Sequence, residues 1–187
     1  HLFQEPSSQR LFLSWGGQPF RVTELNPTTG RILGNPASPA YDTHPPGTHV
    51  PVANWNGDEW TDGNDWFEGP ALFQHGGYWY LFGSYGNLSL NYTIRMGRGT
   101  SPTGPFYDKQ GRDLNAFDPV DQEYGNSFLL GDEGDQVVPG HPHVWEENGQ
   151  HYLGYDYRRH KSVEDTEPDY NGIRRLSFEA GWPTIWT

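Results

Sequence analysis

Short apolar segments separated by turn-forming residues recur along this chain. Three stretches share one pattern, in which two apolar segments flank a polar turn. The first copy is Leu2–Gln4 with Leu11–Gly16, the second is Leu72–Gln74 with Tyr80–Gly86 around His75-Gly76-Gly77, and the third is Val144–Glu146 with Tyr152–Tyr155 around Asn148-Gly149. Gly-Gly and Asn-Gly supply the positive φ angles that tight hairpins require. Each copy is therefore predicted to form two antiparallel strands.

The copies are evenly spaced. Their anchor aromatics are Phe3, Phe73 and Trp145, so the intervals are 70 and 72 residues. A further strand is predicted after each hairpin, at Phe20–Leu25, Tyr92–Gly97 and Ile173–Phe178. Units of about four strands at a constant period are typical of propeller blades.

Composition supports an all-β fold. Aromatic residues make up 16% of the chain, which also has 24 Gly and 16 Pro, and no long stretch has helical periodicity. Aromatic side chains suit a pleated surface, while Gly and Pro punctuate it. Because blades close into rings of about four to eight, three copies are too few, and we expect further blades upstream. A β-sandwich with accidental similarity between segments is the alternative.

Charge and hydropathy exclude several classes of partner. The chain has 24 acidic and 12 basic residues, for a net charge of -12, so we expect no nucleic-acid partner. Its longest apolar runs are far shorter than the ~20 residues that cross a bilayer, so we expect no membrane partner. The absence of cysteine excludes disulfides, thiolate metal sites and cysteine nucleophiles.

Two polar residues occupy equivalent places in the repeat. Glu68 lies five residues before Phe73, and His141 lies four residues before Trp145. In a propeller the innermost strand of each blade lines the central channel, so both side chains are predicted to point at one spot. A solvated carboxylate at the start of a strand is the alternative for Glu68, and its place in the repeat favours the channel.

Several motifs are spread over essentially the whole chain. They are WFEGP at 66–70, YWYLFGSYG at 78–86, NYTIRMGR at 91–98, SPTGPF at 101–106, PGH at 139–141, GIRRL at 172–176 and GWP at 181–183. In their residues and their order these motifs resemble glycoside hydrolase family 43, whose arabinanase branch has a five-bladed propeller. The resemblance implies three blades of an all-β five-bladed propeller, with approximate boundaries at 1–65, 66–138 and 139–187, plus the closing strands.

The resemblance also implies a mechanism. Glu68 corresponds to the general acid of an inverting glycosidase, in which a second carboxylate activates water. The family's general base and the aspartate that tunes the acid would precede His1, so we expect this chain to be inactive alone. The N-terminal segment of the same protein, as a second chain, is the expected partner. The predicted activity is hydrolysis of α-L-arabinofuranosyl linkages in plant cell-wall arabinan or arabinoxylan; the alternatives are a β-xylosidase-type enzyme and a non-catalytic carbohydrate-binding propeller.

A histidine pair raises the question of a metal. The resemblance points to a calcium or sodium ion near His141 and to no organic cofactor. His141 and His143 alternate along one strand and so share a face, which is also compatible with a transition metal. A hydrogen-bonded histidine is the alternative. Two departures from the family, Gly99 in place of a common Ser and Tyr155-Asp156-Tyr157 in place of a Tyr-His pair, leave the substrate specificity open.

Aromatic residues provide the candidate substrate contacts. Trp55, Trp60 and Trp66 lie among asparagines and aspartates, and Tyr85 lies in the second motif. Aromatic faces stack on sugar C–H surfaces while amides and carboxylates bind hydroxyls, so these four residues are predicted to bind substrate. A packed surface loop and an acidic calcium loop are the alternatives for the tryptophan-rich segment.

Overall fold

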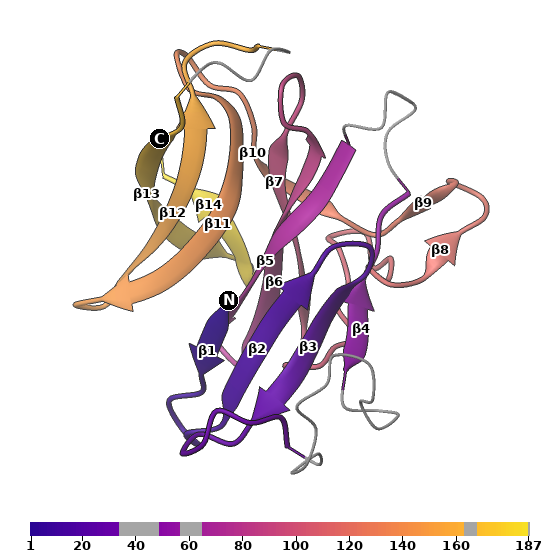
Figure 1. Cartoon of the computed structure of the whole chain (residues 1–187), viewed down its shortest axis with the longest axis vertical. Coiled ribbons are helices and arrows are strands. Elements are labelled where there is room, and N and C mark those ends of the chain that lie inside the picture. Colours follow the sequence, from indigo (N-terminus) through magenta and orange to yellow (C-terminus); the bar gives the residue numbers. More distant parts are fainter. Residues whose placement is uncertain (34–48, 57–64, 163–167, 187) are drawn as a thin grey trace.

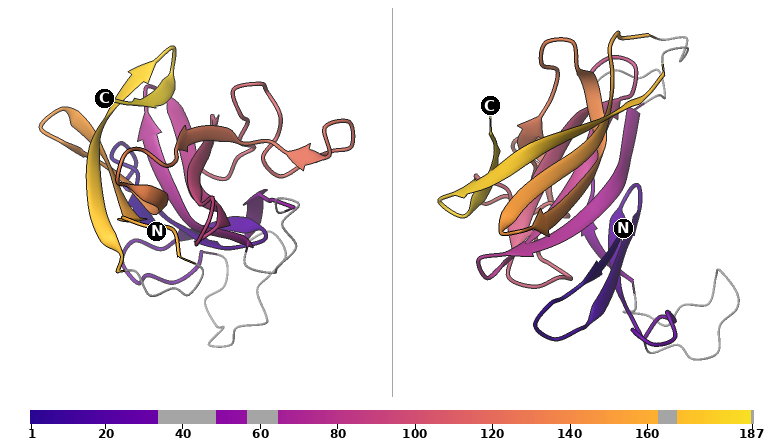
Figure 2. Two further views of the ribbon diagram at one scale, coloured as in Figure 1. Left: turned by 90° about the horizontal axis from the view of Figure 1, so that it is seen from above. Right: turned by 90° about the vertical axis from the view of Figure 1, so that its left-hand side faces the viewer.

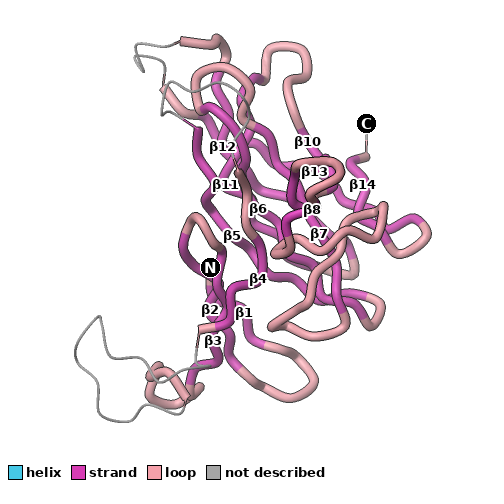
Figure 3. The backbone as a smooth tube through the Cα atoms, turned by 90° about the vertical axis from the view of Figure 1, so that its right-hand side faces the viewer, coloured by secondary structure: helices cyan, strands magenta, loops and turns pink. Residues whose placement is uncertain are grey.

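The structure is a computed structural model that describes all residues except 34–48, 57–64, 163–167 and 187. Every regular element in the described residues is a strand, as Figure 3 shows. The described residues include no helix long and apolar enough to cross a membrane.

Three four-stranded antiparallel sheets follow one another along the chain (Figure 1). The first contains β1 (Leu2–Gln4), β2 (Leu11–Gly16), β3 (Phe20–Leu25) and β4 (Val50–Ala53), in that order. The second contains β5 (Asp65–His75), β6 (Tyr78–Asn87), β7 (Thr93–Gly99) and β10 (Ser127–Leu130), and the third contains β11 (Val137–Glu147), β12 (Gln150–Arg158), β13 (Tyr170–Glu179) and β14 (Trp182–Ile185). A small ribbon of β8 (Phe117–Asp118) and β9 (Glu123–Tyr124) precedes β10.

Each repeat copy forms the first hairpin of a separate sheet. In the second and third sheets, His75 pairs with Tyr78 and Glu147 pairs with Gln150, which leaves two-residue turns. The residues of these turns have positive φ angles, between 53° and 82°. The predicted hairpins and their turn chemistry are confirmed. The expected third strands are also present as β3, β7 and β13.

The first strands of the sheets lie beside one another. β5 packs against β11 on one side and against β1 and β2 on the other. The rings of His1 and His143 lie with their centroids 5.0 Å apart, so the first sheet also meets the third. Seen from above in Figure 2, the three sheets radiate from this shared region. The predicted unit starts at 66 and 139 fall within the first three residues of β5 and β11.

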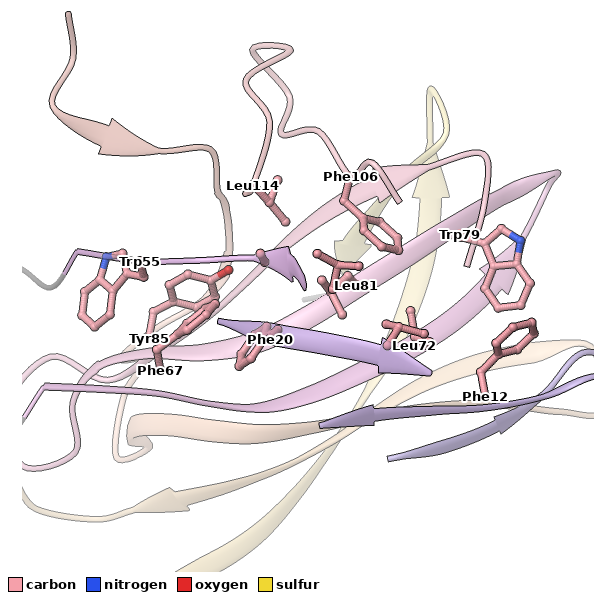
Figure 4. Packing of buried hydrophobic residues seen from close by; sticks show 13 residues of the cluster. Phe12, Phe20, Trp55, Phe67, Leu72, Trp79, Leu81, Tyr85, Phe106 and Leu114 are labelled. Atoms are coloured by element: carbon pink, nitrogen blue, oxygen red, sulfur yellow. The ribbon is translucent and has the colours of Figure 1, made fainter. Parts of the chain in front are cut away.

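Two clusters of apolar side chains hold neighbouring sheets together. Between the first and second sheets, Phe20 stacks on Phe67 with ring centroids 3.7 Å apart, and Phe12 packs edge-on against Trp79 (Figure 4). Between the second and third sheets, the buried residues include Phe82 of β6 and Leu153 of β12. The middle sheet thus buries both faces and each outer sheet buries one, as expected of blades that cannot be stable alone.

Candidate active site

Glu68 lies near the start of β5, the first strand of the middle sheet, and is half-buried. It pairs with Ser84 of β6, and the register then shifts before Ala71. Gly69 sits at this bulge with φ +64°, a conformation that favours glycine. Bulges re-aim side chains, and here the irregularity follows directly after the carboxylate.

Tyr92, which precedes β7, binds Glu68. Its hydroxyl donates a hydrogen bond of 2.7 Å to Oε1 of the carboxylate. Burial is the main factor that raises the pKa of Tyr92, and the hydrogen bond to Glu68 raises it further. The phenol therefore remains a proton-bearing donor at neutral pH.

His141 reaches the same place from the third sheet. Its backbone N–H donates a 2.8 Å hydrogen bond to the hydroxyl of Ser84, whose side chain is fully buried. The preceding Gly140 allows a close approach, because a Cβ atom there would lie 2.2 Å from the Tyr92 ring. His141 has φ +49°, a left-handed conformation that is uncommon for a residue other than glycine. Glu68 and His141, predicted to meet from equivalent slots, lie in adjacent parts of the structure.

Asp156 extends this group. Gly140 pairs with Asp156 across β11 and β12, and Nδ1 of His141 lies 3.8 Å from Oδ2 of Asp156. The other oxygen, Oδ1, accepts a 2.5 Å hydrogen bond from Asn171. His141, Asp156 and Tyr92 line a cavity of about 100 Å³. Tyr92, which binds the Glu68 carboxylate, thus shares one cavity with His141 and Asp156.

The described residues do not provide a ligand set for the predicted ion. No group of three His, Cys, Asp or Glu side chains in this part of the chain is arranged to hold a metal. Only Asp156 among the described carboxylates forms an ion-pair contact with His141. The ring of His143 instead packs near His1 and Trp145. A calcium or sodium ion beside His141 stays a prediction, and no chemical step is derived through it.

The aromatic residues predicted to bind substrate lie in different environments. Trp55 and Tyr85 are 4% and 1% exposed and pack with Phe67 in the core, so neither ring offers a free face to a sugar (Figure 4). Polar neighbours in the sequence and a place in a motif do not distinguish a core aromatic from a groove aromatic. Trp66, two residues before Glu68, is 50% exposed. Trp60 lies outside the described residues.

Ser84, Tyr92 and Asp156 were not predicted as site residues. Ser84 interrupts the apolar run of β6, and a polar residue in a buried strand was the available signal. Asp156 belongs to the Tyr155-Asp156-Tyr157 departure from the family motif, which is the signal that the sequence offers for it. Nothing in the spacing singled out Tyr92, since its contact with Glu68 depends on the pairing of β6 with β7.

A family model described as glycosyl hydrolases family 43 matches residues 1–183. The chain belongs to this family. An arabinan endo-1,5-alpha-L-arabinosidase B of Emericella nidulans is 32% identical over 127 residues, which are 62% of this chain and 30% of that protein. An extracellular exo-alpha-(1->5)-L-arabinofuranosidase of Cellvibrio japonicus is 32% identical over 100 residues, which are 51% of this chain and 27% of that protein.

Solved family 43 structures share the fold. A Cellvibrio cellulosa alpha-L-arabinanase complexed with arabinohexaose matches with a TM-score of 0.73 and 23% identity over 98% of this chain and 55% of that one. A family 43 endo-arabinanase of Bacillus licheniformis matches with a TM-score of 0.68 and 25% identity over 98% of this chain and 55% of that one. The prediction of an all-β, partial five-bladed propeller is confirmed. The chain spans about half the length of these family 43 structures.

Proposed function

We propose that the whole protein hydrolyses α-L-arabinofuranosyl linkages in arabinan or arabinoxylan, with Glu68 as the general acid. The observation that carries this proposal is the placement of Glu68 at the start of β5, with Tyr92 on its carboxylate and His141 beside its strand. The family match and the printed activities of the arabinan-degrading relatives support it. A carboxylic acid in this position would donate a proton to the oxygen of the leaving sugar.

The proposed reaction follows the inverting template. One carboxylic acid protonates the glycosidic oxygen, while a second carboxylate, about 6.5–9.5 Å away, removes a proton from the attacking water. Glu68 supplies the first function. We assign the second to a carboxylate of the N-terminal segment, so that this chain alone is inactive.

The first and third sheets each have an exposed face, which supports the proposal that a further segment of the protein packs on them. On the third sheet, Trp145 pairs with Tyr152 and Ile173 pairs with Gly154 on the face opposite the apolar cluster, and Ile173 is 68% exposed. On the first sheet, Leu2 is 59% exposed. Exposed apolar side chains on a sheet face favour association. Further sheets of the same protein would cover both faces and close the ring.

The decisive experiment compares the full-length protein with its Glu68→Gln variant. On an arabinoside with a poor leaving group, loss of the acid should lower kcat by about 100-fold or more. The leaving oxygen of an aryl arabinoside with a good leaving group needs less protonation. The substitution should therefore lower kcat on that substrate much less. If the variant turned over both substrates as fast as the wild-type protein does, the assignment of Glu68 would be contradicted. Proton NMR of the first product formed tests inversion, and retention would contradict it.

Assays of the full-length protein on other substrates separate the two alternative functions. Turnover of aryl xylosides but not aryl arabinosides would identify a β-xylosidase-type enzyme. Saturable oligosaccharide binding without hydrolysis by the full-length protein would identify a binding propeller. Light scattering of residues 1–187 with and without the separately expressed N-terminal segment tests the partner. A well-folded 21.3 kDa monomer with full activity would contradict the proposal that a second segment is needed.

A further inference from the structure

A second pocket lies far from Glu68, where the second and third sheets meet. It has a volume of about 350 Å³, and its principal side chains are Tyr78, Arg98, Thr100, Tyr107, Lys109 and Trp182. We call it the basic aromatic pocket. Along β6, Trp79 is level with Gly99 of the pocket, whereas Ser84 is level with Glu68. Five residues of strand correspond to roughly 17 Å, so the pocket is separate from the candidate active site.

Arg98 supplies a fixed positive charge. Its guanidinium carbon lies 4.3 Å from the ring centroids of both Tyr78 and Trp182. Nη1 donates to the backbone carbonyl of Gly181 at 2.6 Å. Stacking between two rings and a backbone hydrogen bond hold the group in one geometry, which lowers the entropy lost when a ligand binds.

Lys109 adds a second cation at the exposed rim. Its Nζ lies 5.9 Å from the Trp182 ring, and its backbone N–H donates to Ser127 Oγ at 2.8 Å. Neither Lys109 nor Arg98 forms an ion pair with a carboxylate in the described part of the chain. This is notable in a protein that has 24 acidic and only 12 basic residues.

Asp108 does not neutralise the pocket, although it is one of the lining residues. Its side chain is fully buried and accepts hydrogen bonds from Arg112 Nε at 2.8 Å and from the backbone N–H groups of Gln110 and Arg112, each at 2.9 Å. The carboxylate is therefore occupied by Arg112 and by the turn it stabilises. Lys109 and Arg98 determine the charge that a ligand meets.

Tyr107 offers a surface for a sugar ring, because it is 41% exposed beside these cations. Aromatic faces bind the C–H surface of a sugar, and cations bind a carboxylate. We propose that the basic aromatic pocket is a second carbohydrate-binding site that recognises a uronic acid residue of an acidic polysaccharide. This inference rests on the proposed glycan-degrading function, and the pocket would hold the polymer while neighbouring chains are cleaved.

The ligand follows from the combination of groups. A neutral sugar would gain little from two cations without carboxylate partners. A phosphate-rich polymer would meet an isolated basic site on a protein of net charge -12, so long-range repulsion would oppose it. A single carboxylate on a sugar ring uses both the aromatic surface and the local positive charge.

Calorimetry on the full-length Glu68→Gln protein tests this site without turnover. Trigalacturonic acid should bind saturably, and Lys109→Gln should weaken binding by about tenfold, as expected for the loss of a charge-assisted hydrogen bond. Tyr107→Ala should weaken it as well. The control is Lys161→Gln, which makes the same charge change where the lysine pairs with Asp132 at 2.5 Å. Raising the salt from about 50 to 500 mM should weaken binding, because screening reduces the charge contribution.

Several results would overturn the inference: no saturable binding, equal binding of neutral arabinotriose, equal binding of inorganic phosphate, or equal weakening by Lys161→Gln. The proposed hydrolysis is tested separately. Lys109→Gln in the otherwise wild-type protein should leave turnover of a small aryl arabinoside unchanged. If the wild-type protein binds trigalacturonic acid through Lys109 yet cleaves no arabinoside, the proposed function fails and the binding site stands.

Discussion

The hydroxyl of Tyr92 donates a 2.7 Å hydrogen bond to Oε1 of Glu68. The two residues are 24 positions apart, Glu68 in β5 and Tyr92 directly before β7, so the contact depends on the pairing of β5, β6 and β7. A donor held in this position orients the carboxylate. The orientation of the proposed acid is therefore set partly by its neighbour.

Tyr92→Phe should lower kcat on a poor-leaving-group arabinoside by about tenfold, since a hydrogen bond to a charged group contributes about 1.5–3 kcal/mol. Loss of the hydroxyl leaves the Glu68 carboxylate without the donor that orients it. Steady-state kinetics measure the effect. The control is Tyr107→Phe, which removes the hydroxyl of an exposed tyrosine paired with Arg98, at the end of β7 away from Tyr92. An unchanged kcat in Tyr92→Phe would contradict the role assigned to its hydroxyl.

Gly69→Ala should impair both folding and activity. A positive φ costs about 1–2 kcal/mol for a residue with a Cβ atom. At Gly69 the added atom would also lie 3.3 Å from the His141 ring and 3.3 Å from the hydroxyl of Ser84. Gly76→Ala is the matched control, because Gly76 has φ +58° with no atom within 4 Å of the added Cβ. Both variants should unfold at lower urea, but only Gly69→Ala should lose turnover; equal activities would show that the contact is unimportant.

Phe20→Ala should destabilise the junction of the first and second sheets. Phe20 is fully buried and stacks on Phe67, and truncation of a buried Phe costs about 3–5 kcal/mol. Equilibrium urea denaturation measures the loss. Phe128→Ala removes the same atoms from a residue that is 60% exposed and should change stability little. Similar losses in the two variants would argue against the first apolar cluster as the structural link between these sheets.

Tyr85 should make the fold sensitive to alkali. Burial raises the pKa of Tyr85 above its ordinary value of 10.0. The contribution of neutral Tyr85 to the free energy of unfolding is complete below the pKa of tyrosine in the unfolded chain. It is lost as the pH rises from that value toward the pKa of Tyr85 in the folded protein, because in this range only the unfolded chain ionises readily. The free energy of unfolding should therefore fall above about pH 10, and less steeply in Tyr85→Phe. Identical slopes in the variant and the wild type would contradict this.

The sequence by itself determined the repeat. Turns such as Gly76-Gly77 and Asn148-Gly149 are recognisable because positive φ is a local requirement that few residue types meet. The equivalent slots of Glu68 and His141 followed from that repeat. A period conserved between copies places equivalent residues at equivalent positions, whatever the details of packing. Family motifs that resemble glycoside hydrolase family 43 could be recognised for the same reason, since they are properties of the linear chain.

Only the tertiary structure decided which side chains meet. Trp55 and Tyr85 belong to the core because the first sheet covers them. Trp66, which lies between them in the sequence, remains exposed. Tyr92 reaches Glu68, and Asp156 reaches His141, through strand pairing that joins distant segments. Burial and long-range contact depend on how three sheets pack together, and that packing is a sum over many weak interactions that no local pattern encodes.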